Sequence, residues 1–479
     1  MKLGLNALGL IVARVGSDAL SLVLFVLLSR HFGPEGTGAY SSAFALATFA
    51  FMAVCMGLDS YGVREFTLQP PERRGHWVGE LLGTQAAMIL LCVIVLAVLL
   101  AATGGDVAEY RIVVWLTSYQ FLTALARTLF IPAVASEKMV WPAMADVLCR
   151  ALAITTALRI MQAEPTAPVK DVLVGFPIAG ALLLAIAFGS AVRQGVWARP
   201  NLSRTAISGV VVSLWSFAAA EIFQLVFSRM GLLTVSDMVG DAAAGQFSTG
   251  QKLLELSCMP LVLIGTAAYP RLLRLYGEDR EQFTVIAMRL IWLMILASGC
   301  IAWGIYFLAP PFIIPLFGAR FADSVGVIEE MSSIAVVQAL ESLIWPIIIA
   351  AHLQVARFKV IVAATAVSFG LHLVLVRAYG VDGAVLATFL SFGLLVALFA
   401  NLMRRFLPTR FLLGAAVTFL LALSSGLTVF SFEPDHNLWW AMPWPLVAYV
   451  LPVAAGFWWL QHSLRSSRGL GFPKTTESV

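Results

Sequence analysis

The sequence predicts an all-α polytopic membrane protein with about 14 transmembrane helices. Three observations support this fold class: 60% of the 479 residues are hydrophobic, only 12% are charged, and the mean hydropathy is +0.89. Soluble domains carry about 25% charged residues. The composition therefore excludes a cytoplasmic enzyme, a secreted disulfide-rich protein and a disordered chain.

Long apolar runs follow one another along the whole chain. A membrane-spanning helix needs about 20 apolar residues, and the runs have this length without the two-residue alternation of a membrane β-barrel. Helices are therefore expected, at residues 8–29, 39–61, 79–102, 112–135, 139–159, 172–192, 207–228, 245–270, 284–308, 325–350, 360–376, 383–403, 411–431 and 444–462.

The positions of the cations predict the topology. With 14 spans both termini lie on one side, and 19 of the 31 Lys and Arg residues fall on that side, against seven on the other and five within the spans. Cytoplasmic loops carry the excess of Lys and Arg. The sequence therefore predicts that both termini lie in the cytoplasm.

Internal similarity suggests two lobes. Residues 30–36 (RHFGPEG) resemble residues 377–383 (RAYGVDG), and residues 38–42 (GAYSS) resemble residues 245–249 (GQFST). Two equally oriented six-helix lobes around a central cavity are a transporter plan. The expected division is an N-terminal lobe (1–192), a cytoplasmic linker (193–206), a C-terminal lobe (207–403), an extra helix pair (404–463) and a cytoplasmic tail (464–479).

Enzyme and cofactor motifs give no lead. The five cysteines form no C-x-x-C pair, the six histidines are scattered, and neither H-E-x-x-H nor G-x-S-x-G occurs. We therefore expect neither an enzyme nor a bound cofactor or metal, and the small net charge of +4 gives no reason to expect nucleic-acid binding.

Charged residues inside the predicted spans are the candidate functional groups. An Arg, Lys or Asp at the centre of a bilayer costs about 2.5–3.5 kcal/mol on insertion scales, so such residues face the bundle interior or a wet cavity. The candidate substrate-binding cations, including one at a helix end, are Arg14, Arg30, Arg127, Arg150 and Lys252, and the candidate ion-coupling or cavity acids are Asp18, Asp146, Glu221, Glu255 and Glu341.

Two interpretations of these charges remain open. In the functional one, guanidinium groups in a hydrated, cationic cavity bind phosphate through paired hydrogen bonds, and buried acids such as Glu221 and Glu341 bind a coupling H⁺ or Na⁺. In the structural one, Arg14–Asp18 and Asp146–Arg150, each four residues apart on one helix face, are internal ion pairs that fix helix packing.

Several segments resemble one transporter family in the family's order. They are residues 29–41, 57–59 with 63–65, 245–248 with 252–255, 269–271, 316–321 and 379–384. This set is similar to the polysaccharide-flippase branch of the multidrug/oligosaccharidyl-lipid/polysaccharide exporter superfamily. The resemblance implies a 14-helix, two-lobed flippase for an oligosaccharide on an undecaprenyl-type lipid diphosphate, driven by an ion gradient or the membrane potential through alternating access.

Further expectations follow from this resemblance. Partners would be the bilayer, the lipid-linked oligosaccharide, a coupling H⁺ or Na⁺, and a polysaccharide polymerase or glycosyltransferases. An ion-coupled multidrug exporter of the same superfamily is the main alternative, although interior cations argue against a site for organic cations. A polytopic polymerase or glycosyltransferase is a weaker one, because no predicted outer loop is long enough to carry a catalytic site.

Overall fold

A computed structural model describes residues 2–55, 58–103, 110–136, 138–196, 199–431 and 443–466 of the chain. All regular elements of this described part are helices, as the fold class predicted. Residue 57 of the motif at 57–59, and the predicted tail beyond residue 466, lie outside it. Contacts divide the chain into two compact units, Met1–Gly245 and Gln246–Val479. The finer division predicted from the sequence stays a prediction.

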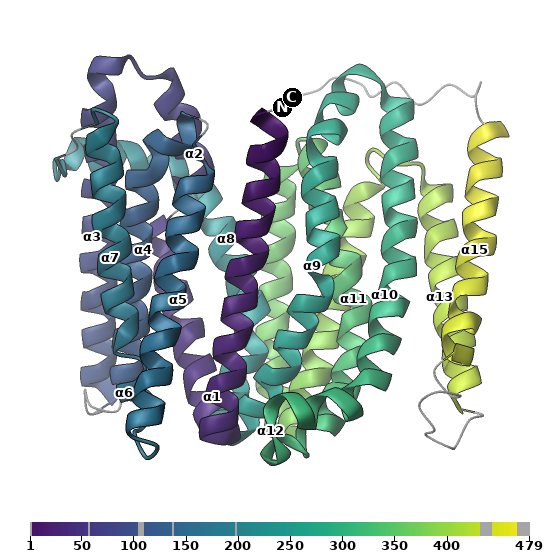
Figure 1. Cartoon of the computed structure of the whole chain (residues 1–479). Coiled ribbons are helices and arrows are strands. Elements are labelled where there is room, and N and C mark those ends of the chain that lie inside the picture. Colours follow the sequence, from purple (N-terminus) through teal and green to yellow (C-terminus); the bar gives the residue numbers. More distant parts are fainter. Residues whose placement is uncertain are drawn as a thin grey trace. The chain divides into compact units, whose positions relative to one another are not determined.

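The first unit consists of helices that run up and down beside one another (Figure 1). Their bounds are α1 (Lys2–Cys55), α2 (Leu58–Leu68), α3 (Pro71–Thr103), α4 (Arg111–Ala135), α5 (Val140–Ala163), α6 (Val169–Val172), α7 (Gly175–Arg193) and α8 (Arg204–Met238). Helix α4 lies at the centre of this packing, because it contacts α1, α2, α3, α5 and α7.

The second unit is built in the same way. Helix α9 (Asp241–Glu278) begins just before the boundary and continues into this unit. The unit also contains α10 (Arg280–Phe317), the 3₁₀ turn η1 (Ala319–Phe321), α11 (Ser324–Ala350), α12 (Gln354–Met403), α13 (Thr409–Ser431) and α15 (Pro443–Ser466). The last two pack on each other, and the fully buried Tyr449 of α15 joins them to α10 through a 3.0 Å hydrogen bond with Ser298.

Ten described helical segments are long and apolar enough to cross a membrane. They include twelve of the fourteen predicted spans, because α1 and α12 each contain two. Helices α4 and α5 cover the remaining two predicted spans but are not among the ten. These two helices carry Arg127, Asp146 and Arg150 within their apolar sequences.

Each double span reverses direction at a single glycine. Gly33 in α1 has φ 71° and Gly380 in α12 has φ 62°, a backbone region that favours glycine. Polar side chains join the two arms across each reversal: the Thr37 hydroxyl lies 3.1 Å from that of Ser29, and the His372 imidazole lies 3.2 Å from the Thr388 hydroxyl. The similar segments 30–36 and 377–383 therefore form the same structure, a helical hairpin.

A second pair of glycines permits close packing at the end of the first unit. A Cβ on Gly38 would meet the backbone carbonyl of Asp241, and a Cβ on Gly245 would meet that of Pro34. The second arm of α1 and the start of α9 thus approach backbone to backbone. Any larger side chain at either glycine would force these segments apart.

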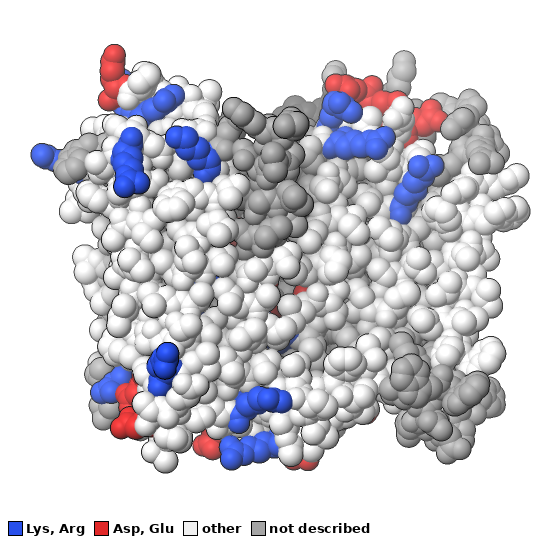
Figure 2. Space-filling view, in the orientation of Figure 1, with Lys and Arg blue, Asp and Glu red and all other residues white. Residues whose placement is uncertain are grey.

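Charged side chains gather near the helix ends on the face shown in Figure 2, and the surface between them is white. Many large apolar side chains are exposed, such as Leu90 and Leu148 in the first unit and Phe369 and Leu420 in the second. Such a surface matches the apolar interior of a bilayer, where only backbone groups bonded within a helix are tolerated. The chain is a multi-pass membrane protein.

Candidate functional site

An open cavity of about 490 Å³ lies in the first unit, and we call it the polar cavity because of its charged side chains, although most of its surface is apolar. Residues of helices α1, α2, α4, α5 and α7 line it, and they include four charged side chains that the sequence singled out: Asp18, Arg127, Asp146 and Arg150. They come from three different helices. Both α4 and α5, which are not among the ten candidate spans, contribute charged residues to this cavity.

One wall of the cavity is a ladder of polar contacts between α1 and α5. The Arg150 Nε donates a hydrogen bond to Asp146 Oδ2 at 2.9 Å, one turn earlier in α5. Across from them, the Ser17 hydroxyl donates to Asp146 at 3.3 Å, and an Arg150 guanidinium nitrogen donates to the Ser21 hydroxyl at 3.2 Å. The ladder fixes the α1–α5 register and leaves both charged side chains about a quarter exposed.

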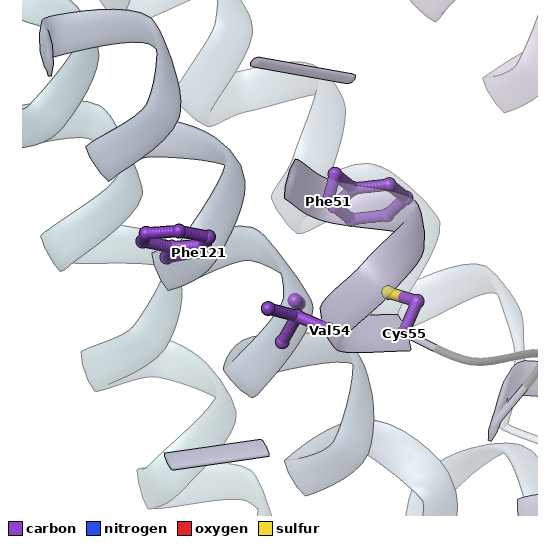
Figure 3. Packing of buried hydrophobic residues seen from close by; sticks show 5 residues of the cluster. Phe51, Val54, Cys55 and Phe121 are labelled. Carbon is purple, nitrogen blue, oxygen red and sulfur yellow. The ribbon is translucent and has the colours of Figure 1, made fainter. Parts of the chain in front are cut away.

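Arg127 is positioned differently, by an aromatic ring. Its guanidinium carbon lies 5.0 Å from the centre of the Phe51 ring, within the range of a cation–π interaction. Phe51 belongs to a buried cluster of α1 and α4 residues, with Val54, Cys55, Phe121 and Ala124 (Figure 3). This cluster packs the second arm of α1 on α4 and therefore holds the ring against which Arg127 rests.

The described cavity lining is balanced in charge. It carries two arginines and two aspartates, so the excess of positive charge expected from the sequence is not seen among these residues. The expected Asp146–Arg150 ion pair is present. A balanced lining can still bind an anion, because a guanidinium paired on one edge keeps donors on the other for a phosphate oxygen.

The other candidates in the first unit do not line this cavity. Arg30 is exposed, close to the Gly33 reversal, and the Glu221 side chain is exposed on α8 rather than buried as expected. Arg14 lies in the helical stretch of α1 whose side chains the structure does not describe. Its expected pairing with Asp18 therefore stays a prediction.

Three candidates lie in the second unit. Lys252 and Glu255, three residues apart in α9, form an ion pair of 3.7 Å in which both side chains are about a third exposed or less. Glu341 is partly buried in α11 and interacts electrostatically with Arg357 of α12. The structure thus brings four of the ten candidates together in one cavity, and these three are not among its described lining residues.

Sequence reasoning missed the hydroxyl groups of the site. Ser17 and Ser21 complete the ladder, and the buried Thr123 lines the cavity beside Arg127. The four-residue spacing of Ser17 and Ser21 matches that of Asp146 and Arg150, which was the available signal. No group of three potential metal ligands comes together among the described residues.

Several solved structures that this chain resembles in fold are described as a flippase or as transporters. The structure described as "Lipid II flippase MurJ, inward closed conformation" matches with a TM-score of 0.71 and 14% identity over 95% of this chain and 99% of that one. A mutant form of the Vibrio cholerae MATE transporter VcmN matches at 0.56 and 12% identity, over 84% and 97%. The eukaryotic MATE transporter AtDTX14 matches at 0.57 and 13% identity, over 87% and 98%. At these identities the likeness shows the fold alone.

The sequence itself matches a family described as "Polysaccharide biosynthesis protein", whose model covers residues 3–276. No curated protein matches the chain. The matched region is more than half of the sequence and contains nearly the whole first unit, including its polar cavity. The chain belongs to this polysaccharide biosynthesis protein family.

Proposed function

We propose that the protein is a flippase, and not an enzyme, which moves a lipid-diphosphate-linked oligosaccharide across the bacterial inner membrane for surface polysaccharide assembly. The observation that carries this proposal is the pair of guanidinium groups, Arg127 and Arg150, in a polar cavity within membrane helices. A planar guanidinium donates two parallel hydrogen bonds to phosphate. The polysaccharide family and the MurJ-like fold support the same conclusion.

The division of the substrate between water and lipid fits the exposed surfaces of the first unit. Sugar and diphosphate need polar partners, which the cavity offers through Arg127, Arg150 and Thr123. The lipid tail can stay in the bilayer, beside apolar side chains such as Leu148. We propose that alternating access driven by an ion gradient or the membrane potential moves the headgroup, with Asp18, Asp146, Glu221, Glu255 or Glu341 as sites for H⁺ or Na⁺.

The test is translocation of a fluorescent lipid-diphosphate sugar in proteoliposomes that contain the full chain. Arg127→Gln should reduce the rate by at least about tenfold, because one charge-assisted contact to phosphate is worth about 1.5–3 kcal/mol. Arg111→Gln is a matched control: Arg111 also lies on α4, but it is exposed and pairs with Asp171 at 3.1 Å outside the cavity. Equal transport by both variants would refute the cavity assignment.

The second candidate is an ion-coupled multidrug exporter, which the match to MATE transporters favours. The two functions differ in substrate charge, since a drug cation would need the aspartates and the lipid diphosphate needs the arginines. Dye efflux from cells that express the chain separates them. Efflux that depends on Asp146 but not on Arg127 would support the exporter.

Cytoplasmic termini are part of the same proposal. The ends of the chain would lie on the side where most loop cations lie, as the positive-inside rule requires. Polysaccharide polymerases or glycosyltransferases would act before or after the transport step. When fused after residue 479, a reporter that works only in the cytoplasm should be active, and a reporter that works only outside the cytoplasm should be inactive.

A further inference from the structure

A second pocket of about 560 Å³ opens on the first unit, and it shares no lining residue with the polar cavity. It lies where the C-terminal end of α4, the N-terminal end of α5 and the C-terminal end of α7 meet. Its described lining is Ala133, Lys138, Trp141, Ile186, Gly189, Ser190, Arg193 and Gln194. The proposed transport step uses none of these residues.

The pocket carries positive charge without acids in its described lining. Lys138 and Arg193 are both exposed, and neither forms an ion pair with an acidic side chain among the residues that the structure describes. Glu137, next to Lys138 in the sequence, lies outside that description. Two cations from segments far apart in the chain thus line the same pocket, where both can attract an anion.

Two polar side chains of the lining, Ser190 and Gln194, are held in place beside a largely apolar pocket surface. The Gln194 amide donates to the Ser190 hydroxyl at 3.3 Å. The Ser136 hydroxyl, outside the described lining, donates to the Pro132 carbonyl at 2.8 Å and also lies 3.3 Å from the Gln194 side-chain oxygen, which links the end of α4 to the last turn of α7. The hydroxyl and amide groups of Ser190 and Gln194 can bond the oxygens of a headgroup.

The rim of the pocket is apolar and continuous with the lipid-facing surface. Trp141 is 51% exposed, and the exposed side chains of Met144, Leu148, Phe188 and Val192 extend from it along α5 and α7. Tryptophan is enriched at the level of lipid headgroups. A ligand with a phosphate in the pocket could therefore lay acyl chains on the adjoining helices, which a free phosphate cannot do.

We infer that this pocket binds the phosphate headgroup of an anionic phospholipid. Basic pockets between transmembrane helices are known to hold such headgroups. Lys138 and Arg193 contact the phosphate, Ser190 and Gln194 the polar headgroup, and Trp141 marks the interface. The site is separate from the transport cavity, and its assignment does not depend on the proposed function.

The test measures lipid retention by the purified full chain in native mass spectrometry, with phosphatidylglycerol and phosphatidylcholine of identical acyl chains as probes. The unaltered chain should retain phosphatidylglycerol preferentially. The double substitution Lys138→Gln with Arg193→Gln should reduce that preference by about 30-fold, since each cation near an anionic lipid contributes a factor of about five. Arg404→Gln with Arg405→Gln, at the exposed end of α12, removes the same charge and should change nothing.

A steric variant tests the pocket without changing charge. A Cβ on Gly189 meets no heavy atom within 4 Å, so Gly189→Leu should fold normally and fill the pocket. It should lower phosphatidylglycerol retention, while Gly370→Leu, at an equally open helical position, should not. If Lys138 and Arg193 were only solvated cations at helix ends, Gly189→Leu would not change lipid retention. A wild-type preference for phosphatidylglycerol in both Gly189→Leu and the Lys138→Gln with Arg193→Gln double variant would overturn the inference.

Inorganic phosphate distinguishes the two sources of a phosphate group. Retained phosphatidylglycerol should resist millimolar phosphate at matched ionic strength, because its acyl chains add contacts outside the pocket. Displacement of the lipid by phosphate would assign the pocket to a soluble anion and overturn the lipid assignment. The absence of any preference between the two lipids in the unaltered chain would also overturn it.

Discussion

The Arg127 guanidinium lies 5.0 Å from the centre of the Phe51 ring, on the cavity side of the cluster that packs α1 on α4. This relationship links the stability of the first unit to the position of a candidate substrate-binding charge. An aromatic ring attracts a cation through its quadrupole and does not cancel its charge, so this contact by itself leaves the guanidinium able to attract an anion.

Phe51→Leu should therefore impair transport more than its effect on stability explains. It keeps an apolar side chain and removes the ring, a loss of about 0.5–2 kcal/mol in holding the cation. We expect a decrease of severalfold in the proteoliposome assay. Phe121→Leu is the matched control, because Phe121 is buried to the same 8% exposure in the same cluster. Equal transport losses in the two variants would contradict a positioning role for Phe51.

Substitutions of Asp146 and Arg150 should be strongly non-additive. Asp146→Asn or Arg150→Gln alone leaves a partly buried charge without its 2.9 Å partner and should cost about 1–3 kcal/mol of stability. The double variant should recover most of this loss, because no unpaired charge remains. Thermal unfolding in detergent measures these differences.

The same double variant separates the two interpretations of the ion pair. If Arg150 binds substrate, transport stays low although stability returns, and this is the outcome we expect. Recovery of transport together with stability would assign the pair to helix packing only.

Alanine at Gly33 or Gly380 should destabilise the chain by about 1–3 kcal/mol. Both glycines combine a positive φ with a ψ of −167° or −129°, close to a backbone region that is nearly restricted to glycine and that costs an L-residue about this much. Gly16→Ala in α1 and Gly370→Ala in α12 are the controls, since each lies in a regular helix with open space around it and should be neutral or slightly stabilising. A melting temperature that falls equally in all four variants would refute the role of the reversals.

Gly38→Ala should be more harmful than these changes at open positions. Its methyl group would meet the Asp241 carbonyl, and a backbone group cannot move aside as a flexible side chain can. Overpacking of this kind costs about 1–3 kcal/mol. The melting temperature of Gly38→Ala should fall below that of Gly209→Ala, which has open space at its Cβ. An unchanged melting temperature would mean that the two segments separate easily.

Most of the helices could be predicted from the sequence, because a run of apolar residues of bilayer length has few alternatives to a helix. Even α4 and α5, which are too polar to be among the ten candidate spans, were predicted at residues 112–135 and 139–159. Hydropathy did not reveal that the spans joined at Gly33 and Gly380 continue without a loop, since that depends on one φ angle at each site.

The site was harder to predict. The four-residue spacing of Asp146 and Arg150 correctly indicated one helix face, but spacing within a helix does not reveal which helix lies opposite. Nothing in the sequence could therefore place Ser17 beside Asp146 or Phe51 beneath Arg127, or show the balance of charges around the cavity. Glu221 was expected to be buried because of its place in an apolar run, and its exposure depends on how α8 is turned.

The reversals at Gly33 and Gly380 also bear on how the chain enters the membrane. The turn between two such spans holds only a few polar residues, such as Arg30 and Glu35 or Arg377 and Asp382, so each pair should be inserted together as one unit. An epitope or protease site placed at Gly33 or Gly380 would interrupt the hairpin itself, and accessibility mapping there would report on a damaged protein. Labels on the connections outside these two turns avoid that artefact.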